Sequence, residues 1–282
     1  LIVGALPDSL PLLASLKTSD EVALPERLLG LVQASEVADE LELRFSAGAD
    51  WLAASGIDRA LETLATTSFR AGSIQAPEAL LKGRRIGIAK DLAFSFIYDA
   101  NIRLLKEMGA SVHYFSPLTD SELPDVDALW LPGGYPELHA AELSKNTRIL
   151  QQIADFHQQQ KPILAECGGF LYCLQTLTDL NEQAYPMTGI LSGQGAMRGK
   201  RGCQGMQTLP LPEGDIRGHA HHRSRSEQTP DPIAYGKRQR HSAPGEAIYR
   251  EHGLTASYLH LFFPSNPVAM AKIFNPAVHD DA

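Results

Sequence analysis

Cys167 is the residue best placed for nucleophilic chemistry. It follows the apolar run Pro162–Ala165 and precedes Gly168 and Gly169, so a strand is predicted to end where a helix begins. The small residues beside the cysteine suit a sharp strand-to-helix turn. At a helix N-terminus the dipole favours the thiolate, and the Gly168 N–H would face a developing oxyanion. A buried structural cysteine beside packing glycines is the alternative interpretation, and both stay open on these residues alone.

A glycine-rich loop is predicted to lie near the same turn. Gly133 and Gly134 follow the apolar run Asp127–Leu131, and their backbone can approach a ligand closely and offer N–H groups. In a doubly wound sheet, ligands bind at the carboxyl ends of the strands, where Cys167 would also lie. An ordinary glycine-rich turn is the alternative explanation of this loop.

A thiol nucleophile needs a base, and His260 is the candidate among ten histidines. It follows the strand-like run Ala256–Leu259, and a strand holds a base more rigidly than a loop does. A histidine with only a structural role is the alternative. Cys173 and Cys203 have no such context and are predicted to be packing residues.

Composition restricts the class of protein. The chain has 282 residues and a formal net charge of -8, which argues against nucleic acid or an anionic membrane as a partner of the whole surface. No run of about 20 apolar residues occurs, so no membrane span is predicted. Three cysteines cannot all pair, and a chain of this length needs no disulfide framework. We therefore expect a reducing compartment and a cytoplasmic location.

The order of elements predicts the fold class. Strands are predicted at 85–89, 112–115, 127–131 and 162–165, with helices at 96–108 and 147–160 between them. This alternation is typical of an α/β protein with a mainly parallel sheet and helices on both faces. After Tyr185, strand-like pieces around a polar loop at 223–245 suggest antiparallel additions at the sheet edge. A closing helix is predicted at 267–274.

The first part of the chain has a different character. Prolines break short apolar pieces over residues 1–45, one amphipathic helix is predicted at 47–64, and residues 66–82 read as a linker. Because the first residue is Leu1 rather than methionine, we expect a fragment that begins inside a larger protein.

Taken together, the motifs resemble a known family, the glutamine amidotransferase half of the cobyrinic acid and hydrogenobyrinic acid a,c-diamide synthases. The matching segments are Leu131-Pro-Gly-Gly-Tyr-Pro-Glu-Leu-His139, Ala165-Glu-Cys-Gly-Gly169, Ser257-Tyr-Leu-His260, Asp91-Leu-Ala-Phe-Ser-Phe96, Phe115-Ser-Pro-Leu118, Tyr185-Pro-Met187, Arg217-Gly-His219 and Ser265-Asn-Pro267. The resemblance implies a class I glutamine amidotransferase-like, flavodoxin-like domain over 83–276. It also implies that residues 1–65 are the remnant of an ATP-binding domain similar to dethiobiotin synthetase.

The resemblance implies a role for each site residue. Cys167 attacks the side-chain amide of glutamine, and His260 passes a proton to the leaving ammonia. Gly133, Gly134 and Gly168 form the oxyanion and glutamine-binding part of the site. Ammonia then serves ATP-dependent amidation of the a and c carboxylates of a corrinoid, cobyrinate or hydrogenobyrinate.

The resemblance also implies which groups act elsewhere. ATP and Mg²⁺ belong to the complete enzyme, and none is expected on this fragment, since no Gly-x-x-x-x-Gly-Lys-Ser/Thr phosphate loop occurs in it. The family's two-domain arrangement suggests a homodimer.

Some residues depart from the family pattern. Phe262 stands where many class I glutaminases carry a glutamate two residues after the histidine, so we expect a Cys–His dyad or an orienting group from elsewhere. Residues 205–207 and 220–221 also differ from common family residues. These differences leave open another cobalamin-type amidotransferase, such as cobyric acid synthase.

Four residues are candidates for the substrate side: Asp91, Tyr135, Arg217 and His219. Residues 198–240 carry nine Lys or Arg against four Asp or Glu, which suits a polycarboxylate such as the corrinoid but also a solvated loop. His219 and His221 would share a strand face while His222 would not, and no acidic or cysteine partner lies at ligand spacing, so no metal site is predicted.

Two further classes stay open. A ThiJ-like or peptidase-like cysteine hydrolase would keep the turn at Cys167, but such proteins usually place the base histidine near the cysteine in sequence, and here Gly168 follows. A non-catalytic docking module would have no need of Cys167, Gly134 and His260.

Overall fold

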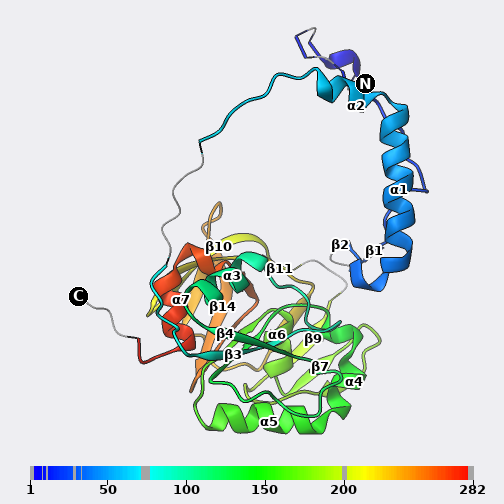
Figure 1. Cartoon of the computed structure of the whole chain (residues 1–282). Coiled ribbons are helices and arrows are strands. Elements are labelled where there is room, and N and C mark those ends of the chain that lie inside the picture. Colours follow the sequence, from blue (N-terminus) through cyan, green and yellow to red (C-terminus); the bar gives the residue numbers. More distant parts are fainter. Residues whose placement is uncertain are drawn as a thin grey trace. The chain divides into compact units, whose positions relative to one another are not determined.

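The computed structural model describes residues 3–7, 9–10, 12–27, 30–32, 34–70, 77–198 and 202–278. The chain forms two compact units, residues 1–74 and 75–282 (Figure 1). The boundary falls within the predicted linker 66–82, of which residues 71–76 lie outside the described residues. The assignment of 1–65 and 83–276 to two domains of different ancestry stays a prediction.

The first unit is built around two helices instead of the single one predicted at 47–64. Its elements are η1 (Val3–Ala5), β1 (Glu26–Arg27), β2 (Gly30–Leu31), η2 (Ala34–Glu36), α1 (Ala38–Ala54) and α2 (Ile57–Glu62). Gly56, with φ 75°, separates α1 from α2 because only glycine adopts this left-handed conformation readily. The prediction missed both the early start of α1 and this break.

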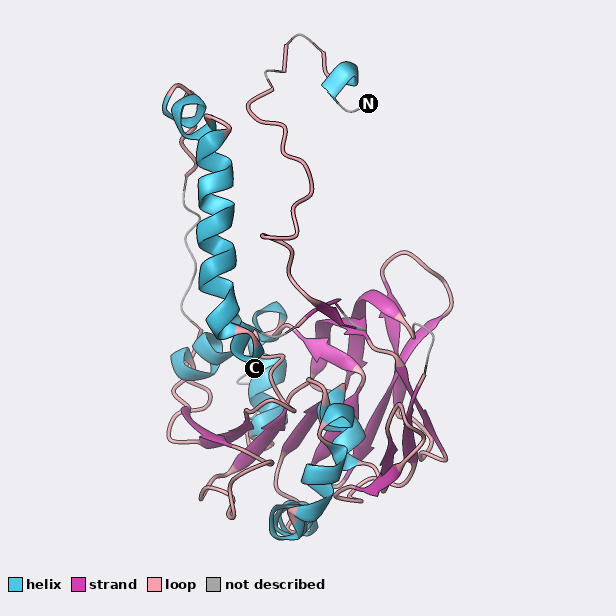
Figure 2. Ribbon diagram, turned by 90° about the vertical axis from the view of Figure 1, so that its right-hand side faces the viewer, coloured by secondary structure: helices cyan, strands magenta, loops and turns pink. Residues whose placement is uncertain are grey.

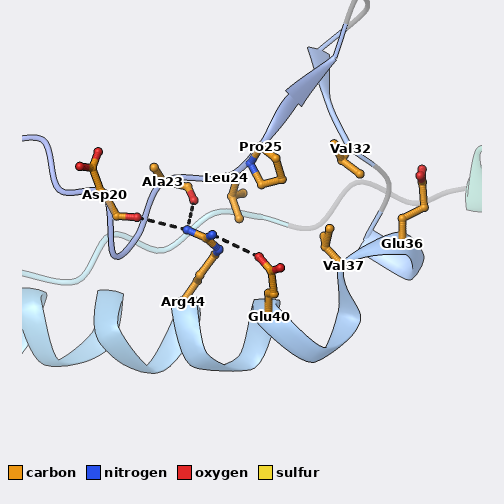
Figure 3. Close-up of a pocket in the computed structure, with 9 residues that line it drawn as sticks. All are labelled: Asp20, Ala23, Leu24, Pro25, Val32, Glu36, Val37, Glu40 and Arg44. Atoms are coloured by element: carbon orange, nitrogen blue, oxygen red, sulfur yellow. Dashed lines mark hydrogen bonds and ion pairs between the residues drawn. The ribbon is translucent and has the colours of Figure 1, made fainter.

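Arg44 ties the segment before β1 to α1. Its guanidinium donates to the carbonyl oxygens of Asp20, at 3.2 Å, and Ala23, and it pairs with Glu40 at 3.2 Å (Figure 3). These interactions surround a pocket formed wholly within the first unit. The descent of this unit from an ATP-binding domain stays a prediction.

The second unit contains the four predicted parallel strands, β3 (Arg85–Ala89), β4 (Ser111–Phe115), β5 (Ala128–Leu131) and β6 (Ile163–Glu166). A fifth parallel strand, β15 (Leu254–Ser257), pairs with β6, although the pieces after Tyr185 were predicted to be antiparallel. The five strands lie in the order β15-β6-β5-β3-β4. The short apolar runs form strands because helices cover both faces of the sheet and every side chain of β5 and β6 is buried.

An antiparallel region continues the same sheet and is larger than predicted. It comprises β10 (Gln204–Leu211), β11 (Gly214–His221), β13 (Ala234–Arg238), β14 (Pro244–Glu251) and β16 (Leu259–Leu261), in the order β16-β11-β10-β13-β14-β15. Within the described residues, five of the nine neighbouring pairs in this sheet are antiparallel, so the sheet is mixed and not mainly parallel. The sheet curls (Figure 2), because β16 continues directly from β15 and yet pairs with β11.

The prediction of a polar loop at 223–245 is wrong, because strands occupy much of this region. It contains β12 (Ser224–Glu227), β13 and the first residues of β14. β12 belongs to a smaller sheet with β9 (Gln194–Met197), β7 (Thr176–Thr178) and β8 (Ala184–Pro186). The polar sequence of β13 hides its strand character, which arises from pairing with β10 and β14 on either side.

Helices cover both faces of the large sheet, as predicted. The helices are α3 (Asp99–Glu107), α4 (Ala140–Lys145), α5 (Thr147–Gln158), α6 (Gly168–Cys173) and α7 (Pro267–Phe274), with the short turns η3 (Pro136–Leu138) and η4 (Phe263–Ser265). α3 and α7 share one core with Trp130, whereas α4, α5 and α6 share the other with Leu129. Figure 1 shows α3 and α7 on the side of the sheet opposite α5.

Helix boundaries differ from the predicted ones at both ends of α3 and at the end of α5. α3 ends at Glu107, one residue before the predicted end. α3 begins at Asp99, not Phe96, because Phe96 pairs with Gly133 in an isolated bridge. α5 ends at Gln158, two residues before the predicted end. Among the described residues, no helix is long and apolar enough to cross a membrane.

Packing of α3 on the sheet gives a stability prediction. Leu105 is fully buried, so Leu105→Ala should lower the free energy of unfolding by about 2–5 kcal/mol through lost burial and a cavity. Leu180 is 46% exposed, so Leu180→Ala should change it by less than about 0.5 kcal/mol. Urea denaturation of both variants measures the difference, and equal effects would contradict the assigned packing.

Candidate active site

Cys167 lies on the predicted strand-to-helix turn between β6 and α6. Its backbone has φ 47° and ψ -101°, a conformation that costs a non-glycine residue about 1–3 kcal/mol and occurs mainly at functional sites. Two hydrogen bonds hold the turn: the Cys167 N–H donates to the Ser257 carbonyl at 2.8 Å, and the Leu171 N–H donates to the Cys167 carbonyl at 3.0 Å. The predicted sharp turn is therefore confirmed.

The glycines around Cys167 permit a very close approach of backbones. A Cβ atom on Gly169 would lie 1.9 Å from the Leu131 carbonyl oxygen, and one on Gly134 would lie 2.0 Å from the Ala93 carbonyl oxygen. A Cβ atom on Gly168 would lie 3.0 Å from the backbone nitrogen of Gly134. Gly134 and Gly168, two of the three residues predicted to form the oxyanion and glutamine-binding part, therefore lie beside each other.

His260 lies on β16 and faces the same loop. A Cβ atom on Gly133 would be 2.1 Å from Cε1 and 2.8 Å from Nδ1 of the imidazole, so the Gly133 backbone packs directly on the ring. On another side the Phe96 ring lies 5.8 Å from the imidazole, between centroids. His260 is 7% exposed.

The two halves of the site thus meet at one loop. Gly133 contacts the imidazole of His260, and Gly134 adjoins Gly168, the neighbour of Cys167. The thiol and the imidazole do not hydrogen-bond in this structure, and among the described residues no group hydrogen-bonds the His260 ring. Catalytic hydrogen bonds are often long until substrate binds, so this geometry is compatible with a Cys–His dyad.

Burial keeps Cys167 as a neutral thiol, contrary to the expected helix-stabilised thiolate. The side chain is 4% exposed, and this burial raises the pKa of Cys167 above its usual value, with Glu137 adding to the effect. The Gly168 N–H, which hydrogen-bonds the sulfur, opposes this but is the weaker influence. The dipole argument was correct in direction, but desolvation outweighs it.

His260 is also neutral. Burial, together with the nearby His219, His222 and His221, lowers the pKa of His260 to about 4. At neutral pH the imidazole therefore carries no charge and can accept a proton.

Asp91 and Tyr135 hold the loops of the site. The Asp91 carboxylate accepts hydrogen bonds from the Ser116 hydroxyl at 2.8 Å, from the Leu118 N–H at 3.0 Å, and from two N–H groups of its own turn. Tyr135 is buried with its ring edge-on to Phe96, 5.1 Å between centroids. These contacts explain both residues structurally, and their substrate-side roles stay predictions.

Arg217 and His219 lie on β11, on the face of the sheet that His260 shares. His219 is the direct register partner of His260. A row of three cross-strand neighbours lies next to this pair and lines a pocket. It consists of Arg217, Thr208 and Lys237. The two cations of this row, Arg217 and Lys237, suit a carboxylated ligand. The substrate-side roles of Arg217 and His219 stay predictions. No metal-binding cluster of three His, Cys, Asp or Glu occurs among the described residues.

Glu166 is a further residue beside the site that was not predicted: it precedes Cys167 in the chain and hydrogen-bonds the strand that carries His260. Glu166 is 2% exposed and hydrogen-bonds both Trp130 of β5 and the backbone of β16. Its signal in the sequence is an acidic residue that ends a strand buried on both faces. Burial raises the pKa of Glu166 to about 8, against the opposing effects of its two hydrogen bonds.

Comparison with known proteins agrees with this geometry. Residues 85–268 match the CobB/CobQ-like glutamine amidotransferase domain. The chain is 44% identical over 272 residues to hydrogenobyrinate a,c-diamide synthase of Stutzerimonas stutzeri and 42% identical over 272 residues to that of Pseudomonas aeruginosa. It is 39% identical over 281 residues to cobyrinate a,c-diamide synthase of Herminiimonas arsenicoxydans.

The fold and the match together define a glutamine amidotransferase domain. The chain belongs to the CobB/CobQ-like glutamine amidotransferase family, and the predicted resemblance is confirmed. Each of these three alignments covers 96% of this chain and 61–62% of the relative, so the chain spans less than two thirds of their length.

The contact between Gly133 and His260 gives a prediction. In Gly133→Ala the new methyl group would have to displace the imidazole, so glutamine hydrolysis should fall by about 10- to 100-fold. Gly4→Ala is the control, because a Cβ atom there meets nothing within 4 Å. Steady-state glutamate release measures both, and an unchanged rate in Gly133→Ala would contradict the arrangement.

The neutral state of His260 gives a pH prediction. Its pKa is about 4 in the folded chain and 6.5 as the ordinary value, so the unfolded state binds the proton first as pH falls from 6.5 to 4. The native protein should therefore lose up to about 3 kcal/mol over this interval relative to His260→Asn. Urea denaturation at several pH values measures this difference, and parallel stability curves would refute it.

Proposed function

We propose that this chain hydrolyses glutamine to glutamate and ammonia as the glutaminase part of a cobyrinate or hydrogenobyrinate a,c-diamide synthase. The observation that carries the proposal is the meeting of the Cys167 turn, the Gly133–Gly134 loop and His260 at one edge of a glutamine amidotransferase fold. The names of the relatives supply the a,c-diamide synthase part.

The chemistry begins from two neutral groups. The sulfur of Cys167 attacks the carboxamide carbon of glutamine while the thiol proton passes to the imidazole of His260. The carbonyl oxygen becomes an oxyanion, held by the N–H groups of Gly134 and Gly168. His260 returns the proton to the leaving nitrogen, and ammonia departs from a glutamyl thioester. Water then attacks the thioester, again with His260 as base, and glutamate leaves as the thiol re-forms.

The low pKa of His260 and the raised pKa of Cys167 suit this sequence of steps. Neither group carries a net charge before glutamine binds. Proton transfer therefore accompanies attack, and the oxyanion donors stabilise charge only as it develops.

Amidation of the a and c carboxylates belongs to the complete enzyme. ATP and Mg²⁺ would be held by a part of the complete enzyme that carries a phosphate loop, a motif that does not occur in this chain. We therefore assign no step of this chain to them. The corrinoid carboxylates would meet the row formed by Arg217, Thr208 and Lys237.

Assembly and location are also part of the proposal. A homodimer would follow the family's two-domain arrangement. A cytoplasmic location would agree with three cysteines that are all unpaired. Another cobalamin-type amidotransferase, such as cobyric acid synthase, has no observation here that favours it over the diamide synthase, and the same applies to a non-catalytic docking module.

Glutamate release tests the proposal. Cys167→Ser should lower the rate by at least about 10³-fold, because the hydroxyl is a far weaker nucleophile than the thiol beside the same base. Cys203→Ser is the matched control and should stay within about twofold of the parent chain, since Cys203 is a free thiol outside the site.

Two outcomes would reject the glutaminase assignment. One is a parent chain that releases no glutamate above background. The other is a release rate that Cys167→Ser leaves intact. Hydrolysis of a peptide or ester substrate without glutaminase activity would favour a different cysteine hydrolase.

A further inference from the structure

β16, the strand that carries His260, lies at the end of the large sheet and needs partners from side chains. On one edge it pairs with β11, where the Phe262 N–H donates to the Arg217 carbonyl at 2.8 Å. Its other edge is buried, and a buried backbone group without a partner costs about 1–3 kcal/mol. The partners on that edge therefore fix the position of the strand.

Two buried side chains serve this second edge. Oε1 of Glu166 accepts the Leu261 N–H at 2.8 Å. Asn101 donates from Nδ2 to the Leu261 carbonyl at 2.8 Å and accepts the Phe263 N–H at 2.9 Å. Asn101 is fully buried and Glu166 is 2% exposed, so water does not compete for these bonds.

Glu166 has a second, independent attachment. Its Oε2 accepts the indole N–H of Trp130 at 2.9 Å, and Trp130 is fully buried on β5. In sequence Glu166 directly precedes Cys167, and through space it holds the residue after His260. One carboxylate therefore joins the strand of the nucleophile, the strand of the base and the strand that leads into the Gly133–Gly134 loop.

From this arrangement we infer that Glu166 is a positioning residue, which sets the imidazole of His260 against the thiol of Cys167 without contacting substrate. The inference rests on the proposed glutaminase function. A positioning role differs from a general role of negative charge. It requires Oε1 to accept the Leu261 N–H and Oε2 to accept the indole N–H of Trp130.

Glu166→Gln tests the acceptor atoms at nearly constant volume. An amide has only one acceptor oxygen. Its NH₂ group, a donor, must therefore face the N–H of either Leu261 or Trp130, and the two donors cannot form a hydrogen bond. We expect kcat for glutamine hydrolysis to fall by about 10- to 100-fold, with KM within about twofold, because misplaced catalytic groups slow the chemical step.

Trp130→Phe supplies the matched background. Without the indole N–H, the amide introduced by Glu166→Gln can turn its oxygen to the Leu261 N–H with no opposing donor. Glu166→Gln should therefore cost less than about threefold in kcat when measured against Trp130→Phe alone. Each kcat is taken per active site, counted by titration with a glutamine analogue that alkylates Cys167, so that partial unfolding does not count as lost catalysis.

Two results would overturn the inference. One is an equal loss of kcat from Glu166→Gln in the parent and in Trp130→Phe, which would indicate a role of charge. The other is no loss of kcat in either background. A loss of folding seen by thermal unfolding in Glu166→Gln alone, with kcat per active site unchanged, would likewise assign a structural role only.

The rate at which iodoacetamide alkylates Cys167 tests the same inference without glutamine turnover. Above pH 8, where Glu166 is charged, removal of its negative charge near Cys167 would speed alkylation if charge alone mattered. Displacement of the base should instead slow it toward the rate of His260→Asn. A faster or unchanged rate in Glu166→Gln overturns the inference even if the parent chain hydrolyses no glutamine, so the two proposals can fail separately.

Discussion

The close contact between the β6–α6 turn and the loop after β5 is the constraint on which the site depends. At Gly169 the turn approaches the Leu131 carbonyl oxygen at the end of β5 so closely that no side chain fits. At Gly134 the loop after β5 approaches the Ala93 carbonyl oxygen equally closely. The contact places the backbone of Gly168 beside that of Gly134, next to Cys167 with its unusual φ. One backbone hydrogen bond, from Cys167 to Ser257, then joins the turn to β15, and three residues further along the chain lies His260.

The sequence predicted the parts of this arrangement that depend on local pattern. Apolar runs located β3, β5 and β6, because strands buried on both faces cannot carry many polar residues. Small residues around Cys167 indicated the tight turn. The meeting of the two halves of the site could be expected only from the rule that parallel strands present their carboxyl ends on one side. The strand-like run before His260 singled it out among ten histidines, and the family resemblance supported that choice.

The parts that could not be predicted depend on long-range contacts. β13 is polar and becomes a strand only between β10 and β14. Phe96 fits a helical pattern, but its bridge to Gly133 keeps it outside α3. The charge state of Cys167 was also misjudged, since a helix terminus can be recognised in a sequence whereas burial of the thiol depends on every element packed around it.

Burial shifts the pKa values of the site in opposite directions, yet in each case it favours the neutral form of the group. It raises the pKa values of Cys167 and Glu166 and lowers that of His260, because in each case it disfavours the charged form. A resting thiol in place of a thiolate is less reactive toward oxidants and stray electrophiles. In the proposed mechanism, charge arises only when a substrate carbonyl offers its oxygen to the N–H groups of Gly134 and Gly168. The same burial makes a misplaced partner costly, since water cannot substitute for it, and the geometry of the loop, the turn and β16 therefore has to be held by hydrogen bonds within the chain.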